Sequence, residues 1–201
     1  MSILKEILMQ LFFALAPFVI YNIYYRDKIR NYSRSFIIIT SSVCLFLSMT
    51  FASSAVDGFI FDIRYVIMFF ALVYGGIQTG LILLVEFVIY RLYLGGEGKW
   101  IAMVILICTF PLSILLYKMY KNTQRKSLIT FIAGIFFSII PLILTYQYNS
   151  NYVIEHLTFH IFVNPVQNSI GIWLLMSLFN KSVSDKEIFI KIGRASCRER
   201  V

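Results

Sequence analysis

The residues with the greatest potential for chemistry lie in one stretch, residues 62–98, which reads DIRYVIMFFALVYGGIQTGLILLVEFVIYRLYLGGEG. Glu86 is the one acid well inside an apolar run. An ionisable group inside a membrane segment is costly, so Glu86 is a candidate functional residue. Its expected partners are Arg91, about a turn and a half later on a helix, and Arg64, on the preceding helix. A structural ion pair and a contact with a ligand explain Glu86 equally well.

Glycines accompany these charges, and each has a structural explanation beside a functional one. The candidates are Gly75, Gly76, Gly80, Gly95, Gly96 and Gly98. The four-residue spacing of Gly76 and Gly80 lets two helix backbones approach closely. The last three glycines permit a tight turn with positive φ. We assign the site region to a set of charged residues, glycines and one amide: Asp62, Arg64, Glu86, Arg91, Gly75, Gly76, Gly80, Gly95, Gly96, Asn168 and Gly171.

A second candidate pattern lies near the C-terminal end of the apolar sequence, where Asn168 and Gly171 follow the pair Asn164-Pro165. Proline in a helix produces a kink and frees a carbonyl, so this pattern forms either a kink or part of a pocket wall. His156 and His160 share one helical face, but two histidines without a third ligand are a weak indication of metal. No nucleophile–base pair, phosphate loop or metal cluster is recognisable. The chain is therefore expected to be non-catalytic, with no cofactor and no metal of its own.

The composition specifies the elements that must position these residues. Of 201 residues, 59% are hydrophobic and 14% are charged, whereas soluble domains average about 25% charged residues. Long apolar runs separated by short polar islands predict an all-α, polytopic membrane helix bundle. Six apolar stretches are recognisable: Ile7–Tyr25, Phe36–Val56, Tyr65–Tyr93, Ile101–Tyr117, Leu128–Tyr148 and Leu157–Phe179.

Loop charge distinguishes six spans from seven. Two loops are basic, and both are expected to be cytoplasmic; they contain Arg26, Lys28, Arg30 and Arg34, and Lys118, Lys121, Arg125 and Lys126. They face the same side only if the third stretch forms two helices, Phe59–Tyr74 and Ile77–Leu94, joined at the paired glycines. The bundle then has seven spans, with its N-terminus outside and its C-terminus in the cytoplasm. Six spans remain the alternative.

Membrane orientation also explains the net charge of +8 better than nucleic-acid binding does, so no nucleic-acid partner is expected. Tyrosines collect at the ends of the predicted spans, which indicates an interfacial aromatic belt. They are Tyr21, Tyr24, Tyr25, Tyr117, Tyr120, Tyr146 and Tyr148.

One series of motifs resembles the five-transmembrane LYT receptor region of LytS-type and sporulation-type sensor histidine kinases. It reads Asp62-x-Arg64, Tyr74-Gly75-Gly76-x-x-x-Gly80 and Tyr90-Arg91-x-x-Leu94-Gly95-Gly96-x-Gly98. Asn168-x-x-Gly171 is similar to the family's final span. Ile77 is a departure, because family members often have proline after the paired glycines.

The resemblance implies a sensory module in the bacterial cytoplasmic membrane, comprising residues 1–180, whose last span passes a conformational change to a kinase. Residues 181–191 would begin the cytoplasmic linker, with Ser184 as the N-cap of a new helix at Asp185. The implied partners are membrane lipid, an unknown small ligand, a second copy of the chain and a response regulator. ATP and Mg²⁺ would belong to the kinase part, which this sequence lacks.

Residues 192–201, IGRASCRERV, resemble the translation of a sequencing adapter, so we expect this tail not to be native. Two other functions remain open. The glycine-rich break also resembles small vitamin-binding subunits of membrane transporters, and the same receptor module could be joined to a cyclase. Three kinds of stimulus would each suit aromatic-rich helices: an apolar ligand, a lipid or membrane tension.

Overall fold

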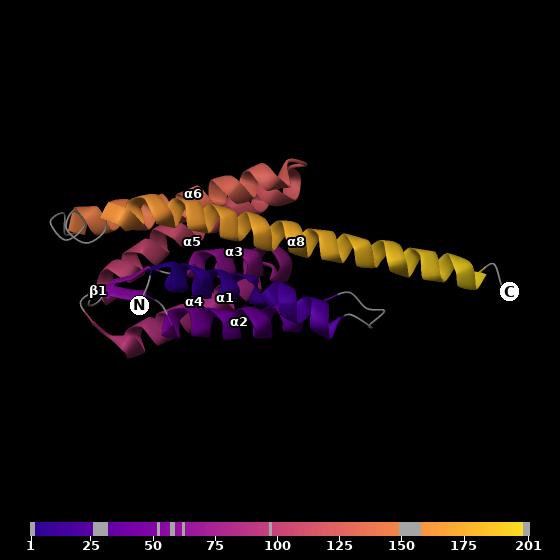
Figure 1. Cartoon of the computed structure of the whole chain (residues 1–201), viewed down its shortest axis with the longest axis horizontal. Coiled ribbons are helices and arrows are strands. Elements are labelled where there is room, and N and C mark those ends of the chain that lie inside the picture. The colour runs from indigo at the N-terminus through magenta and orange to yellow at the C-terminus, as the bar shows by residue number, and fades with distance from the viewer. Residues whose placement is uncertain are drawn as a thin grey trace.

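The computed structural model describes residues 3–25, 32–51, 53–56, 59–61, 63–96, 98–148 and 158–198. Seven helices and one small hairpin lie within these ranges (Figure 1). The helices are α1 (Ile3–Tyr24), α2 (Arg34–Thr50), α3 (Arg64–Gly75), α4 (Ile77–Leu94), α5 (Lys99–Asn122), α6 (Lys126–Tyr148) and α8 (Thr158–Arg198). The hairpin pairs β1 (Ser53–Val56) with β2 (Phe59–Phe61) in antiparallel fashion.

The predicted polytopic membrane bundle is confirmed. By length and composition, α4, α5 and the Lys126–Gln147 part of α6 are each able to cross a membrane. Shorter apolar helices accompany them at Leu11–Tyr24, α2 and α3. The long apolar runs of the sequence therefore fold mainly as helices, which satisfy their own backbone hydrogen bonds in lipid. The predicted stretch Phe36–Val56 differs at its end, because α2 stops at Thr50 and Ser53–Val56 forms β1.

The third apolar stretch divides into two helices at the paired glycines, as the seven-span arrangement requires. Gly76 has φ 81° and ψ 178°, a backbone conformation that ends α3 and starts α4. The helix that precedes the paired glycines was predicted to start at Phe59, and that start was wrong. Phe59–Phe61 pairs as a strand, and α3 begins at Arg64.

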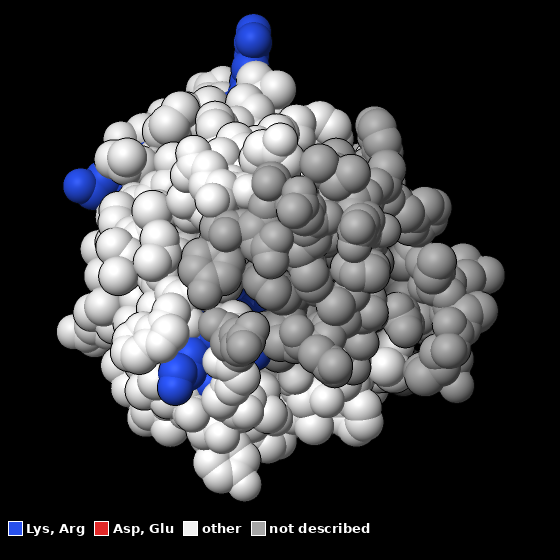
Figure 2. Space-filling model, turned by 90° about the vertical axis from the view of Figure 1, so that its left-hand side faces the viewer, with Lys and Arg blue, Asp and Glu red and all other residues white. Residues whose placement is uncertain are grey.

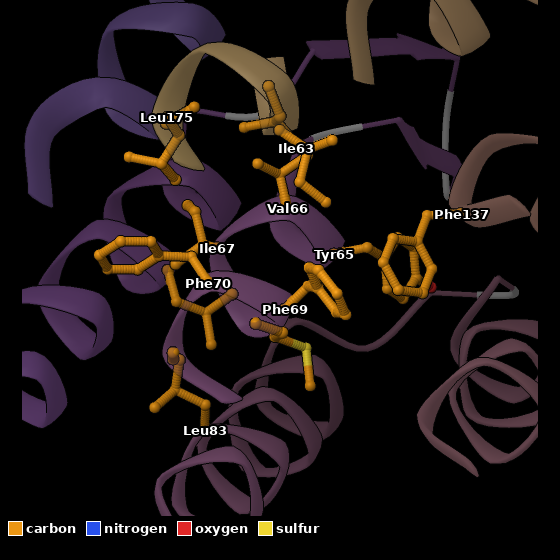
Figure 3. Packing of buried hydrophobic residues seen from close by; sticks show 14 of the residues in the cluster. Ile63, Tyr65, Val66, Ile67, Phe69, Phe70, Leu83, Phe137 and Leu175 are labelled. Carbon is orange, nitrogen blue, oxygen red and sulfur yellow. The ribbon is translucent and has the colours of Figure 1, made fainter. Parts of the chain in front are cut away.

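The centre of the bundle is α3, which contacts α1, α2, α4, α5, α6 and α8. Ten of its twelve residues are buried, and its side chains point into the surrounding helices (Figure 3). A helix that is apolar on every face is stable only when other elements cover it completely. Twelve residues rise about 18 Å, less than the ~30 Å of a bilayer core, so α3 lies inside the bundle as a buried insert.

Exposed basic residues gather at one end of the bundle. This end of the bundle, which we call the inner end, contains the end of α1, the starts of α2 and α6, the α3–α4 turn and the end of α5 (Figure 1). Its exposed basic residues are Arg34, Lys118, Lys121, Arg125 and Lys126. The structure therefore brings the described parts of both basic loops to one end. That this end faces the cytoplasm, with the N-terminus outside, remains a prediction.

Candidate functional site

Two buried arginines lie toward the other end of the α3–α4 pair, which we name the outer end. Arg64, 4% exposed, begins α3, and its guanidinium carbon is 5.1 Å from the centre of the Phe87 ring. Arg91, 3% exposed, lies one turn after Phe87 on the buried face of α4. The structure thus buries both predicted arginines at this end of the α3–α4 pair, with Phe87 against Arg64 and one helical turn before Arg91. Such buried cations are stable only with hydrogen-bonding or anionic partners.

Residues around these arginines complete the outer end. Lys and Arg side chains are visible near the middle of this face (Figure 2). Asp62, predicted to belong to the same region, lies outside the described residues, as does Glu97. Gly95 (φ 68°) and Gly96 (φ 82°) have the predicted positive φ and form the turn that follows Arg91. Gly98 instead has φ −71° and is the N-cap of α5.

Glu86 belongs to a different face of α4 from Arg91. It is half-buried against α2, where its side chain hydrogen-bonds with Ser42. One turn later, the Tyr90 hydroxyl lies 2.8 Å from the Thr50 hydroxyl. The expected ion-pair partners, Arg91 and Arg64, were therefore wrong, because the helical positions direct Glu86 and Arg91 toward different neighbours. Glu86 is part of a polar seam between α2 and α4.

We expect Glu86→Gln to leave the fold intact, because an amide can also hydrogen-bond with Ser42. The free energy of unfolding in detergent should change by no more than about 0.5 kcal/mol. Signal output should nevertheless change, since the substitution removes the one ionisable group of this seam. A signalling reporter measures this effect, with Gln78→Glu, on the exposed start of α4, as the control for a changed charge. Unchanged output would remove Glu86 from the site region.

The predicted glycines of the α3–α4 turn serve close packing. A Cβ on Gly75 would lie 2.4 Å from Oγ1 of Thr79, which itself donates to the Gly75 carbonyl. A Cβ on Gly80 would lie 2.8 Å from Cδ1 of Leu72. Gly75 is buried and Gly76 partly buried, so the turn lies among neighbouring helices.

Asn168 and Gly171 face the bundle from α8. The Asn168 amide nitrogen donates to the Ser138 hydroxyl of α6 at 2.9 Å. A Cβ on Gly171 would lie 2.8 Å from Cδ1 of Ile63. These residues dock α8 and do not meet the buried arginines directly. Pro165 lies inside α8, which is helical on both sides of it. A kink at this proline stays a prediction.

An aromatic cage holds α8 near the inner end. Phe179 is fully buried, with its ring centre 4.4 Å from that of Tyr74 and 4.8 Å from that of Tyr21. Phe70 and Tyr32 complete the cage at 5.0 Å and 5.4 Å. Aromatic pairs at these distances add stability beyond the area that they bury. The cage fixes α8 against α1, α3 and the residues preceding α2.

The next residue, Asn180, bridges α3 and α5. The Tyr74 hydroxyl donates to Oδ1 of Asn180 at 2.7 Å, and Nδ2 of Asn180 donates to the Tyr120 hydroxyl at 2.8 Å. Two residues later, the Ser182 hydroxyl donates to Oδ1 of Asn22 at 2.7 Å. We name Phe179, Asn180 and Ser182 the exit clamp, because α8 leaves the bundle just beyond them (Figure 1).

Sequence reasoning missed the exit clamp. Of the tyrosines assigned to an interfacial belt, Tyr21, Tyr25, Tyr117 and Tyr120 are buried, so that prediction was wrong for these four. Their recurrence at span ends was a usable signal, but it does not reveal which partner each ring meets. The predicted N-cap at Ser184 was also wrong, because α8 is one helix from Thr158 to Arg198.

Among the described residues, no group of three or more metal-ligating side chains occurs.

Comparison with known proteins finds one family. The family described as 5TMR of 5TMR-LYT matches residues 18–182, which is most of the chain. No curated protein and no solved structure shows significant similarity to this chain. The described residues contain seven helices, but most of α1 precedes the matched range and α3 is too short to span a bilayer alone. The matched range runs from the last turns of α1 to the exit clamp of α8.

Proposed function

Because the chain belongs to the family described as 5TMR of 5TMR-LYT, we propose that it is the sensory module of a bacterial two-component sensor histidine kinase. The observation that carries this proposal is the path of α8. This single helix docks along α6, is held by the exit clamp, and continues past the inner end of the bundle. A rigid helix of this kind is suited to transmit a displacement to a cytoplasmic domain.

The outer end of the α3–α4 pair is the proposed recognition region. Arg64 and Arg91 are both buried here, and the Arg64 guanidinium lies over the Phe87 ring. Guanidinium groups bind carboxylates and phosphates through paired hydrogen bonds. We therefore propose that the module recognises a small anionic molecule, and that Asp62 and the Gly95–Gly96 turn belong to the same region.

Recognition and output would be coupled through α3. Arg64 is the first residue of α3, and Tyr74 is the residue before its last. Tyr74 contacts both Phe179 and Asn180 of α8. A ligand that favours one position of α3 would thereby favour one position of α8. Such a ligand shifts the equilibrium only if it binds the two arrangements with different affinity.

The exit clamp provides the test. The chain through Lys191 is fused to the catalytic part of a sensor kinase and placed in lipid vesicles, and autophosphorylation is measured. We expect Tyr74→Phe and Asn180→Leu to change the basal rate about five- to ten-fold, since each removes a hydrogen bond worth about 1 kcal/mol from one of two states. Tyr93→Phe removes an exposed hydroxyl and is the matched control.

A basal rate that neither clamp variant alters would contradict transmission through α8.

The output domain is identified separately, by sequencing the native locus beyond the codon for Lys191. A histidine-containing dimerisation domain followed by an ATP-binding domain is expected. A cyclase domain would preserve the sensory proposal with another output. A stop codon within a few residues would favour the vitamin-binding transporter subunit.

A further inference from the structure

A groove on the membrane-facing side of α6 and α8 has no role in the proposed signalling path. Its volume is about 440 Å³, and it is lined by Ser127, Leu128, Phe131, Ser169, Ile170 and Trp173. Leu128, Phe131, Ile170 and Trp173 are exposed. Ligand sites in proteins commonly measure about 300–1,000 Å³. The groove is thus large enough for part of a lipid molecule.

The groove contains polar groups in a setting where each costs free energy. Ser169 is 2% exposed, and its hydroxyl oxygen has no hydrogen-bond partner among the described residues. The Trp173 indole donates to the Ser127 hydroxyl at 2.8 Å, across the groove from α8 to α6. A buried hydroxyl without a partner is unusual in a native protein. The Ser169 hydroxyl faces Gly134 of α6, since a Cβ on Gly134 would lie 2.9 Å from its oxygen. The polar groups that a bound molecule can reach are therefore those of the exposed Trp173–Ser127 pair.

The mouth of the groove carries positive charge. Ser127 and Leu128 belong to the first turn of α6, directly after the exposed Arg125 and Lys126. The Lys126 ammonium lies 5.5 Å from the Tyr120 ring centre, which holds it at the inner end. The backbone N–H groups of this first turn add a further attraction for an anion. Apolar walls therefore lead to a cationic rim.

We propose that the α6–α8 groove binds one anionic phospholipid. Its acyl chain would lie along Phe131 and Ile170, its ester region near the Ser127–Trp173 hydrogen bond, and its phosphate beside Arg125 and Lys126. Juxtamembrane basic residues attract anionic headgroups by about 1 kcal/mol each, which is roughly five-fold in affinity per charge. This inference requires only that the bundle lies in a membrane, and it is independent of the signalling proposal.

The two tryptophans of the chain, Trp100 and Trp173, make the test direct. Trp100→Phe leaves Trp173 as the only tryptophan, inside the groove. The full chain is placed in phosphatidylcholine vesicles that contain equal fractions of brominated phosphatidylglycerol or brominated phosphatidylcholine. Bromine quenches tryptophan at short range. We expect the anionic lipid to associate with the Trp173 site at least five-fold more strongly.

The double variant Arg125→Gln with Lys126→Gln should abolish this preference, and 1 M salt should weaken it. Both side chains are exposed, so the variant is expected to fold. In a Trp173→Phe chain, quenching of Trp100 should not respond to the same double substitution. Equal quenching of Trp173 by the two lipids would overturn the proposal, as would a preference that survives removal of both charges. Shielding of Trp173 from both lipids would assign the groove to a second copy of the chain and would equally overturn it.

Discussion

Gly134→Ala should destabilise the bundle substantially, although it adds a single methyl group. Gly134 lies on α6 at a close approach to α8. An added Cβ would lie 2.4 Å from Cα and 2.7 Å from the backbone nitrogen of Ser169. Backbone atoms cannot rotate away, so the two helices would have to separate. We expect a loss of about 1–3 kcal/mol in the free energy of unfolding, the usual cost of overpacking.

The matched control is Gly80→Ala. Its Cβ would lie 2.8 Å from Cδ1 of Leu72, the end of a flexible side chain. The gain in helix propensity, about 1 kcal/mol, should offset this smaller conflict. Unfolding of both variants in detergent is followed by circular dichroism. If Gly134→Ala is as stable as Gly80→Ala, then α6 and α8 do not pack as closely as the structure shows.

The second large effect is expected at Phe179. Phe179→Ala would leave a cavity between Tyr21, Phe70 and Tyr74, whose rings all contact the Phe179 ring. Phenylalanine-to-alanine changes cost about 3–5 kcal/mol in soluble cores. The cost should be lower here, roughly 2–3 kcal/mol, because lipid is as apolar as the protein interior and packing contributes most of the loss.

The control for Phe179→Ala is Phe136→Ala, the same change on the exposed side of α6. We expect its unfolding free energy to change by about 0.5 kcal/mol or less. The two variants are compared at equal detergent concentration, and the Phe179 variant is also expected to lose the docking of the last turns of α8. Disulfide trapping between cysteines at Asn22 and Ser182 measures that docking. Undiminished trapping together with unchanged stability would contradict the cage.

Structure and sequence agree best where one physical requirement dominates. A bilayer demands internally hydrogen-bonded backbone, so the apolar runs predicted helices correctly. The break at Gly76 was predictable because paired glycines in a long apolar run permit a turn that other residues resist. The grouping of basic residues at one end followed from counting charges per loop.

Pairwise contacts could not be predicted in the same way. Glu86 and Arg91 are five positions apart, and a sequence does not reveal that one faces Ser42 and the other lies on the buried stripe with Phe87. Similarly, Ser184 satisfies the pattern of an N-cap. Since α8 is already helical on both sides of this position, no new helix begins there.

The sequence by itself determined that this protein is a polytopic helical bundle, where its central apolar stretch divides, and the receptor family that its motifs resemble. These properties depend on composition, periodicity and single residues, which are local. Only the tertiary structure decided that α3 is the buried centre, that Phe179 and Asn180 hold the last helix, and that α6 and α8 form a groove with a basic rim. The physical reason is that hydrogen bonds, aromatic pairs and close backbone approaches join residues that are distant in sequence. Asn180, for example, meets Tyr74 and Tyr120 only because the whole bundle packs in one arrangement.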